Sequence, residues 1–369
     1  MESKNLVICD PETKFASAFA QYLTRQKELA VRVRTCSDLS YVLAIQEKEK
    51  IDFLFISSEY PEESRKQVKA GMVFVIAPER EVALENREVP IYKYQPGDQI
   101  LLERGSVFAG EYLHLYKGGT KEAPVVVDAY GEGALPRIEA DGNGIWYQNY
   151  GGHLDNVVHT WKGYLSSAVL LYDAEYITVR NLEITNDPLV KNERMNQADR
   201  MNRTGVSVIA QNHGTLHQIE LAYLYIHDVE GNIYDKHLNN GGIYMSVSRP
   251  DDEEKTGIAR YDGIHIHHCK VENCRRWGIA AGYTYQHDKF TTLELPDEVV
   301  KTYGSTNVVM EHNFVKDIGG DGITPMYCFE PLIQYNVSEN IAVDIHPELY
   351  NEEGKRGGMT AAAIWPWKC

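Results

Sequence analysis

The segment Gly242-Ile243-Tyr244-Met245 decides the fold, because the chain repeats its pattern. In each copy a glycine is followed by a β-branched residue that opens a short, mostly apolar run. The other copies are Gly205-Val206-Ser207-Val208, Gly278-Ile279-Ala280-Ala281 and Gly322-Ile323-Thr324-Pro325, and successive copies start 37, 36 and 44 residues apart. Internal periods of this length are typical of solenoids, in which successive coils stack and align their side chains. The sequence therefore predicts stacked coils and a site built from equivalent points of neighbouring coils.

A second pattern recurs between these openings. It consists of four positions, nearly all apolar, that are spaced two, three and two residues apart. The copies are Ile177-Val179-Leu182-Ile184, Ile219-Leu221-Leu224-Ile226, Ile264-Ile266-Cys269-Val271 and the weaker Val308-Met310-Asn313-Val315. Steps of two indicate strands with alternate side chains inward, and the step of three indicates a bend where one residue turns a corner. We expect equivalent strands to pair in parallel, about 4.8 Å apart.

Residues 96–369 resemble a right-handed parallel β-helix of the pectin-lyase-like superfamily. The stretch from Pro96 to Gly133 is similar to the first coils of bacterial β-helix proteins that act on polysaccharides. The resemblance implies the fold but not the reaction, because the superfamily contains lyases, hydrolases, epimerases and non-catalytic binders. The junction before Pro96 is abrupt, and Ile364 near the end has the same place in its segment as Ile323 in the last repeat. We therefore expect an incomplete β-helix.

Residues 1–95 lack the repeat and alternate apolar strand segments with helical ones. We expect strands at 4–10, 29–36, 51–57, 71–78 and 89–94, and helices at 11–26 and 37–50, the second capped by Ser37. This alternation predicts an α/β domain with a doubly wound parallel sheet.

The order of these segments resembles a degenerate receiver domain of the response-regulator type. The resemblance implies that Asp10 and Lys93 match functional positions of receivers. Ser57 stands in place of the phosphoacceptor aspartate, and Cys9 and Ala77 replace two further functional residues. Aspartyl phosphorylation requires a carboxylate nucleophile and bound Mg²⁺. We therefore expect no phosphotransfer, which leaves docking of a protein partner or a vestigial domain.

Composition limits the partners and the location. A net charge of −16 argues against a nucleic-acid surface, although a local basic cleft could still bind an acidic sugar. The chain has no apolar run long enough to span a membrane, and its first residues do not resemble a secretory signal. Six cysteines suit a reduced setting rather than a disulfide framework. We expect a cytoplasmic protein with a poly- or oligosaccharide partner, and neither a membrane nor a nucleic acid as partner.

Carboxylates are the candidates for a hydrolytic site. Glycoside hydrolysis uses two carboxyl groups, about 5–5.5 Å or about 6.5–9.5 Å apart. Asp321 and Asp235 lie two coils apart and form the first candidate pair, with Asp228 and Glu330 as substitutes. Asp321 lies in Gly319-Gly320-Asp321-Gly322, however, and an aspartate in such a segment is more often a turn residue.

Basic residues are the candidates for an elimination reaction. A lyase needs a basic side chain to remove a proton and a cation to neutralise the uronate carboxylate. Lys236, Arg275 and Arg276 could serve in these roles, although the two arginines could equally form a solvated bend.

Amide, imidazole and aromatic side chains next to the glycine openings are the candidates for binding sugar. Aromatic faces stack on sugar rings and polar groups bind hydroxyls. These candidates are Asn239, Asn240, Tyr244, Tyr283, Tyr285, His287, Tyr327, Trp365 and Trp367. The alternative for the two asparagines is a turn signal.

No metal site is predicted. His265 and His267 alternate outward and form a candidate pair of ligands, but solvent-facing histidines are commoner. The acidic loop from Asp251 to Glu254 is the place where Ca²⁺ could bind, yet it lacks EF-hand spacing. Taken together, the residues favour glycoside hydrolysis by a carboxylate pair, with uronate elimination and a non-catalytic binding scaffold as alternatives.

Overall fold

The computed structural model describes residues 4–11, 15–17, 19–20, 23, 31–76, 82–84, 94–154, 160–188, 201–232, 238–292, 294–344 and 361–369. The chain divides into two compact units, Met1–Lys93 and Tyr94–Cys369. None of the helices in these described ranges is long and apolar enough to cross a lipid bilayer.

The first unit contains a five-stranded sheet. Its strands are β1 (Lys4–Cys9), β2 (Val31–Cys36), β3 (Ile51–Ser57), β4 (Ala70–Ile76) and β5 (Val82–Leu84), in the order β2-β1-β3-β4-β5. Strands β1 to β4 pair in parallel. Helices α2 (Leu39–Gln46) and α3 (Glu62–Arg65) connect them. Apolar residues of β1, β3 and β4 are buried on both faces of the sheet, as expected where helices cover a parallel sheet.

One prediction for the first unit needs correction, and one strand was not among those expected. Strand β5 pairs antiparallel with β4. The predicted strand at 89–94 lies outside the described residues except for Tyr94, so it stays a prediction. The cap of α2 is Asp38 instead of Ser37, because Asp38 has an extended backbone and its carboxylate accepts a hydrogen bond from the Ser40 N–H, 2.8 Å away. Most of the predicted helix at 11–26 and residues 85–93, including Lys93, lie outside the described residues, as does Ala77. The resemblance to a receiver domain stays a prediction.

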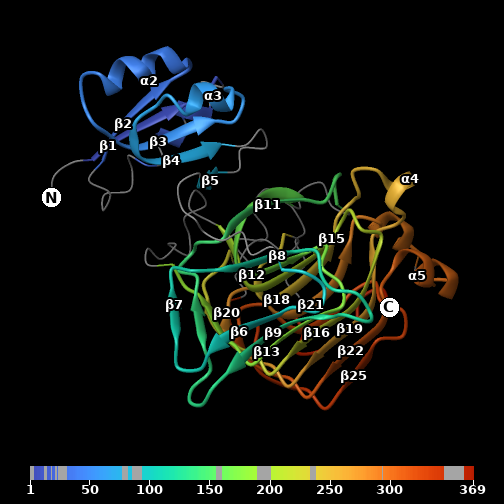
Figure 1. Cartoon of the computed structure of the whole chain (residues 1–369). Coiled ribbons are helices and arrows are strands. Elements are labelled where there is room, and N and C mark those ends of the chain that lie inside the picture. The colour runs from blue at the N-terminus through green and yellow to red at the C-terminus, as the bar shows by residue number, and fades with distance from the viewer. Residues whose placement is uncertain are drawn as a thin grey trace. The chain divides into compact units, whose positions relative to one another are not determined.

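The second unit consists of three sheets that successive coils visit in turn (Figure 1). Sheet 1 contains β6 (Gln99–Glu103), β9 (Val125–Tyr130), β13 (Ile177–Arg180), β16 (Thr215–Ala222), β19 (Arg260–His267), β22 (Thr306–Glu311) and β25 (Leu332–Gln334). Sheet 2 contains β7 (Val107–Ala109), β10 (Arg137–Glu139), β14 (Glu183–Asn186), β17 (Tyr225–Val229), β20 (Lys270–Cys274), β23 (Phe314–Ile318) and β26 (Val337–Ile341). Sheet 3 contains β8 (Leu113–Tyr116), β11 (Ile145–Asn149), β12 (Lys162–Tyr172), β15 (Asn202–Ala210), β18 (Gly241–Val247), β21 (Trp277–Thr284) and β24 (Asp321–Pro325).

The predicted parallel stacking of coils is confirmed by the strand register. In sheet 3 the β-branched residues that follow the glycines are direct partners, from Val206 to Ile243, Ile279 and Ile323. The pairing continues to Ile364 through an isolated parallel bridge. One departure is β11, which pairs antiparallel with β12. This arrangement is that of a parallel β-helix, and its right-handed winding stays a prediction.

Each opening glycine lies where the next coil approaches closely. A Cβ on Gly242 would lie 2.4 Å from Cγ1 of Val271 and 2.6 Å from the Gly278 carbonyl oxygen. A Cβ on Gly278 would lie 2.5 Å from the carbonyl oxygen of Gly322. The repeated glycine is therefore required by the short distance between coils.

The second sequence pattern forms the interior and its corners. Ile177, Ile219, Ile264 and Val308 are direct partners in sheet 1, and all are buried. The residue just before the end of each three-residue step turns the corner with a positive φ between 52° and 56°. These corner residues are Asn181 (φ 56°), Tyr223 (52°), His268 (53°), His312 (55°) and Tyr335 (54°).

A second apolar layer covers the outer face of sheet 3. Side chains of the sheet such as Leu170, Ile209 and Tyr244 pack there against residues from outside it, among them Leu154, Phe290 and Val300. The covering segments include η2 (His287–Phe290) and α5 (Asp297–Tyr303), while the short helix α4 (Glu253–Thr256) lies between β18 and β19 in the chain. This layer contains four of the predicted aromatic site residues, Tyr244, Tyr283, Tyr327 and Trp367.

Candidate functional site

A buried polar network lies beneath the outer layer of sheet 3. Asn239 accepts hydrogen bonds from Nε2 of Gln148 (3.0 Å) and from the Ser246 hydroxyl (2.7 Å), and its own amide donates to the Ser207 hydroxyl (3.2 Å) and the Tyr244 carbonyl (3.0 Å). These contacts use the amide group of Asn239 fully, and its side chain has no exposed surface. Asn239 thus joins neighbouring coils, which is the structural alternative to binding sugar.

Asn240 is also completely buried. Its side-chain oxygen Oδ1 accepts a hydrogen bond from the backbone N–H of Arg203 (3.4 Å), and its side-chain Nδ2 donates to the backbone carbonyl of Asn232. Both predicted amides therefore stabilise the turn and the coil before β18.

The predicted aromatic residues gather in one cluster, but most of them are buried. Tyr283 and Tyr327 contact edge to face with ring centroids 5.5 Å apart, and Trp367 lies 5.4 Å from Tyr327 and 6.2 Å from Trp365. Tyr244 is fully buried and contacts Trp277. Aromatic contacts of this kind stabilise the layer over sheet 3. Packing against one another is enough to explain where these rings lie. Their role in binding sugar therefore stays a prediction.

Tyr285 and His287 lie apart from the centre of this cluster. The Tyr285 hydroxyl donates to Oε2 of Glu253, 2.8 Å away, and the guanidinium of Arg249 lies 5.7 Å from the tyrosine ring centre. Burial and the contact with Glu253 raise the pKa of Tyr285 above its usual value. His287 begins the short helix η2.

Asp321 forms a buried ion pair with Arg276. Its Oδ2 lies 3.2 Å from Nη2 of Arg276, and both side chains are at most 2% exposed. Its Oδ1 accepts hydrogen bonds from the Ala362 N–H and from Nε1 of Trp365, both at 3.0 Å. Asp321 thus fixes the segment that pairs with β24, and its carboxylate does not face solvent among the described residues.

Arg275 is held by two carboxylates that the sequence did not identify as site residues. Its Nε lies 3.2 Å from Oε2 of Glu230, and its Nη1 bonds to Oδ2 of the buried Asp344. Burial alone would lower the pKa of Arg275, but Glu230 and Asp344 raise it above its usual value. Asp344 follows β26 and is 69 residues from Arg275 in sequence, so no local pattern could have revealed the contact. Both predicted arginines are therefore engaged by carboxylates rather than free to act in elimination.

Asp228 lies on sheet 2, away from the contacts of Asp321. Its backbone has a φ of 52°, and its carboxylate accepts hydrogen bonds from Asn273 (2.6 Å) and contacts Nδ1 of His227 (2.8 Å). Asp228 and Asp321 have no hydrogen-bonding partner in common within the described ranges. Asp235 and Lys236 lie outside the described residues.

Glu330 is the predicted carboxylate that borders a pocket. The pocket has a volume of about 480 Å³, within the usual size of small-ligand sites. Its lining includes Leu295, Asp297, Phe329, Glu330, Ile333 and Pro366. Lys301 stabilises this region, since its Nζ lies 3.7 Å from Oδ2 of Asp297 and 4.4 Å from the ring centre of Phe329. The pocket combines two exposed carboxylates with an aromatic ring, which are the groups that the sequence led us to expect in a sugar site.

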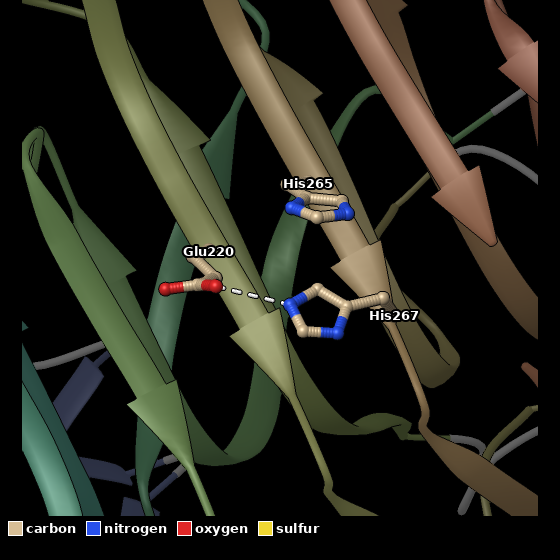
Figure 2. Close-up of side chains that lie close together, drawn as sticks. All are labelled: Glu220, His265 and His267. Carbon is tan, nitrogen blue, oxygen red and sulfur yellow. Dashed lines mark hydrogen bonds and ion pairs between the residues drawn. The ribbon is translucent and has the colours of Figure 1, made fainter. Parts of the chain in front are cut away.

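Two places could hold a metal ion. In the acidic loop, Asp251 bonds to Asn212 and Asp252 caps α4, so two of its acids already have protein partners. Calcium binding there stays a prediction. Glu220, His265 and His267 face one another on the outer surface of sheet 1, as Figure 2 shows, and their ligand atoms lie within 4.8 Å of one another.

The comparisons with known proteins point to one group of enzymes. No protein-family model matches the chain. Over 308 residues the chain is 39% identical to a lacto-N-biosidase of Bifidobacterium longum subsp. longum. Two solved structures of a GH136 lacto-N-biosidase from Eubacterium ramulus, one native and one of the selenomethionine derivative, are 54% identical, with TM-scores of 0.70 and 0.71.

The matches cover most of this chain but less than half of each relative. They include 74% of this chain, 19% of the Bifidobacterium protein and 44% of each Eubacterium chain. At 54% identity the likeness concerns sequence as well as fold, and the similar proteins are carbohydrate-active enzymes.

Proposed function

We propose that the β-helix unit acts in glycoside hydrolysis of an oligosaccharide, as part of a lacto-N-biosidase. The observation that carries this proposal is the 54% identity, over 74% of the chain, to structures of a GH136 lacto-N-biosidase. The chain spans less than half the length of each of these relatives. That it shares the activity of the whole enzyme is therefore part of the proposal.

The pocket beside α5 supports a carboxylate pair as the catalytic device. We assign the two carboxyl groups to Glu330 and Asp297, because both are exposed and both line the same pocket. Hydrolysis at such a pair needs one carboxylic acid to protonate the leaving oxygen and one carboxylate to act as nucleophile or base.

The proposal is tested by release of 4-nitrophenol from 4-nitrophenyl lacto-N-bioside. We expect Glu330→Gln and Asp297→Asn each to lower kcat/KM by about 100-fold or more, because general acid–base groups contribute at least that much. Glu298→Gln is the matched control, since Glu298 is exposed on the same helix and does not line the pocket.

Two further measurements distinguish hydrolysis from uronate elimination and from a non-catalytic scaffold. Near-ultraviolet absorbance with uronate polysaccharides would instead indicate elimination. Binding of the lacto-N-bioside without product would favour a non-catalytic scaffold. Full activity in both pocket variants would show that the carboxylate assignment is wrong.

For the first unit we propose protein docking rather than phosphotransfer. In the resemblance to a receiver domain, Ser57 stands in place of the phosphoacceptor. Ser57 is completely buried, and its hydroxyl accepts a hydrogen bond from the Glu59 N–H at 3.3 Å. Incubation with acetyl phosphate and Mg²⁺ is expected to leave the mass of the protein unchanged, and an acid-stable, base-labile adduct would contradict the proposal.

A further inference from the structure

Two histidines and a glutamate converge on the solvent face of sheet 1. His265 and His267 are two residues apart on β19, so both point outward, and Glu220 is the direct partner of His265 on β16. In Figure 2 the ring of His267 extends from its own strand toward Glu220, and a dashed line joins the two side chains. The separation between Oε1 of Glu220 and Nε2 of His267 is 3.0 Å, and the His265 and His267 ring centres are 4.1 Å apart.

Each of the three side chains is held by a further residue. The Thr178 hydroxyl donates to Oε2 of Glu220 (2.8 Å), and Oε1 of Glu311 lies 3.0 Å from Nε2 of His265. Nδ1 of His268 lies 2.9 Å from Nδ1 of His267. Partners of this kind orient metal ligands and set the tautomer of a histidine.

We propose that Glu220, His265 and His267 bind one divalent transition-metal ion and thereby join the coils of β16 and β19. The ligand atoms lie within 4.8 Å of one another, whereas ligands of a tetrahedral ion at about 2.1 Å are roughly 3.4 Å apart. Small side-chain rotations close this difference, because the side chains of His265 and Glu220 are 41% and 38% exposed.

The ligand set selects the class of metal. Imidazole nitrogens with one carboxylate suit Zn²⁺, Co²⁺, Ni²⁺ and Cu²⁺, whereas Ca²⁺ and Mg²⁺ prefer oxygen ligands. Glu220 is oriented for binding by its contacts with His267 and Thr178. Glu311 adds a second carboxylate next to His265.

Metal binding requires a change of tautomer in two rings. A carboxylate can only accept, so Nε2 of His267 carries a proton toward Glu220; in the neutral ring its Nδ1 then accepts from Nδ1–H of His268. When the ion occupies Nε2, His267 carries its proton on Nδ1 and donates to His268, whose proton moves to the solvent-facing Nε2.

The test measures metal binding by the full, untagged chain after removal of metals with a chelator. We expect one Zn²⁺ per chain by calorimetry, and visible absorbance from Co²⁺ in the same site. His267→Gln and His265→Gln should each weaken binding at least tenfold, whereas His312→Gln, a control on the next coil, should leave it unchanged. Zn²⁺ at a hundredfold excess over its Kd should raise Tm by on the order of 5 °C.

Further readouts separate binding from general effects on folding. Nitrogen NMR should show His267 change from its Nε2–H to its Nδ1–H form upon Zn²⁺ addition. Unchanged far-ultraviolet circular dichroism in each variant shows that lost binding is local, and if His267→Gln fails to fold, the more exposed His265→Gln decides. No Zn²⁺ binding by the unaltered chain, or equal weakening in the His312→Gln control, would overturn the proposal. The experiment needs no substrate, so it is independent of the glycosidase assignment.

Discussion

At the scale of single residues, the molecule uses buried polar side chains as connections between coils. Asp321, Arg276 and Asn239 all lie at the start of sheet 3 strands, where the sequence places them next to the repeated glycines. Each has a partner far away along the chain, such as Trp365 for Asp321 and Gln148 for Asn239. A polar side chain next to a repeated glycine can therefore be structural. Only its hydrogen-bond and ion-pair partners distinguish a structural role from a catalytic or binding role.

Asp321→Asn is expected to destabilise the β-helix unit by about 3–5 kcal/mol. The amide would leave the guanidinium of Arg276 buried without its counter-charge, which is the costly way to break a buried ion pair. Two nitrogens of Arg276, Nε and Nη1, already have no hydrogen-bond partner within the described parts of the chain.

Urea unfolding measures this loss of stability. Asp288→Asn is the control, because Asp288 forms an exposed pair with Lys289 and should change the free energy of unfolding by about 0.5 kcal/mol or less. A loss of activity in Asp321→Asn without a loss of stability would instead favour a catalytic role for Asp321.

His114 makes the stability depend on pH. Burial lowers its pKa to about 4, although its ring Nε2 bonds to the Ser167 carbonyl at 3.0 Å, which acts in the opposite direction. As pH falls from about 6.5 to about 4, the unfolded chain gains a proton that the native protein does not, so stability decreases. The loss reaches about 3 kcal/mol, from 1.36 kcal/mol for each pKa unit.

The pH dependence is measured by comparing unfolding free energies at pH 7.5 and pH 4.5. The free energy of unfolding should fall less in His114→Gln than in the unaltered chain, and the two decreases should differ by about 3 kcal/mol. His153→Gln, which replaces an exposed histidine, should retain the decrease of the unaltered chain. Equal decreases in His114→Gln and the unaltered chain would show that His114 titrates normally.

At the scale of strands, the glycine column sets how closely the coils of sheets 2 and 3 can stack. Gly242→Ala is expected to destabilise by about 1–3 kcal/mol or more, because the new methyl group would overlap Val271 and the Gly278 carbonyl, neither of which can move independently of its strand. Thermal unfolding of the variant checks this expectation.

Gly152→Ala provides the matched control for Gly242→Ala. A Cβ at Gly152 would meet only the end of the Arg249 side chain, at 3.8 Å. The control should remain within about 0.5 kcal/mol of the unaltered chain. If both alanines cost the same, the close approach between coils would not be the reason for the repeated glycine.

At the scale of the whole molecule, the chain has two units with separate apolar cores. The two clusters of the β-helix contain residues from Tyr94 onward, whereas those of the first unit end at Ile76. Residues 94–369 expressed alone should therefore unfold at a Tm within roughly 2–4 °C of the β-helix transition in the full chain, the shift that about 1 kcal/mol causes. Loss of the cooperative transition on removal of residues 1–93 would show that the units depend on each other.

The sequence by itself determined the stacking of coils, because a repeat with alternating apolar positions can bury its side chains in few ways. It predicted the register in sheet 3 and the corner between sheets 1 and 2, since both follow from residues that are neighbours along the chain. It also predicted β1 to β4 of the first unit, but not the antiparallel strand β5.

Only the tertiary structure decided what the polar residues do. It buried Asp321, Asn239 and Tyr244 beneath a second apolar layer, and the segments that form this layer carry no repeat. It also left Glu330 exposed in a pocket and brought Glu220 to His267, a residue 47 positions away. The physical reason is that a side chain's direction follows from its local strand, whereas its burial and its partners depend on segments that arrive from elsewhere in the chain.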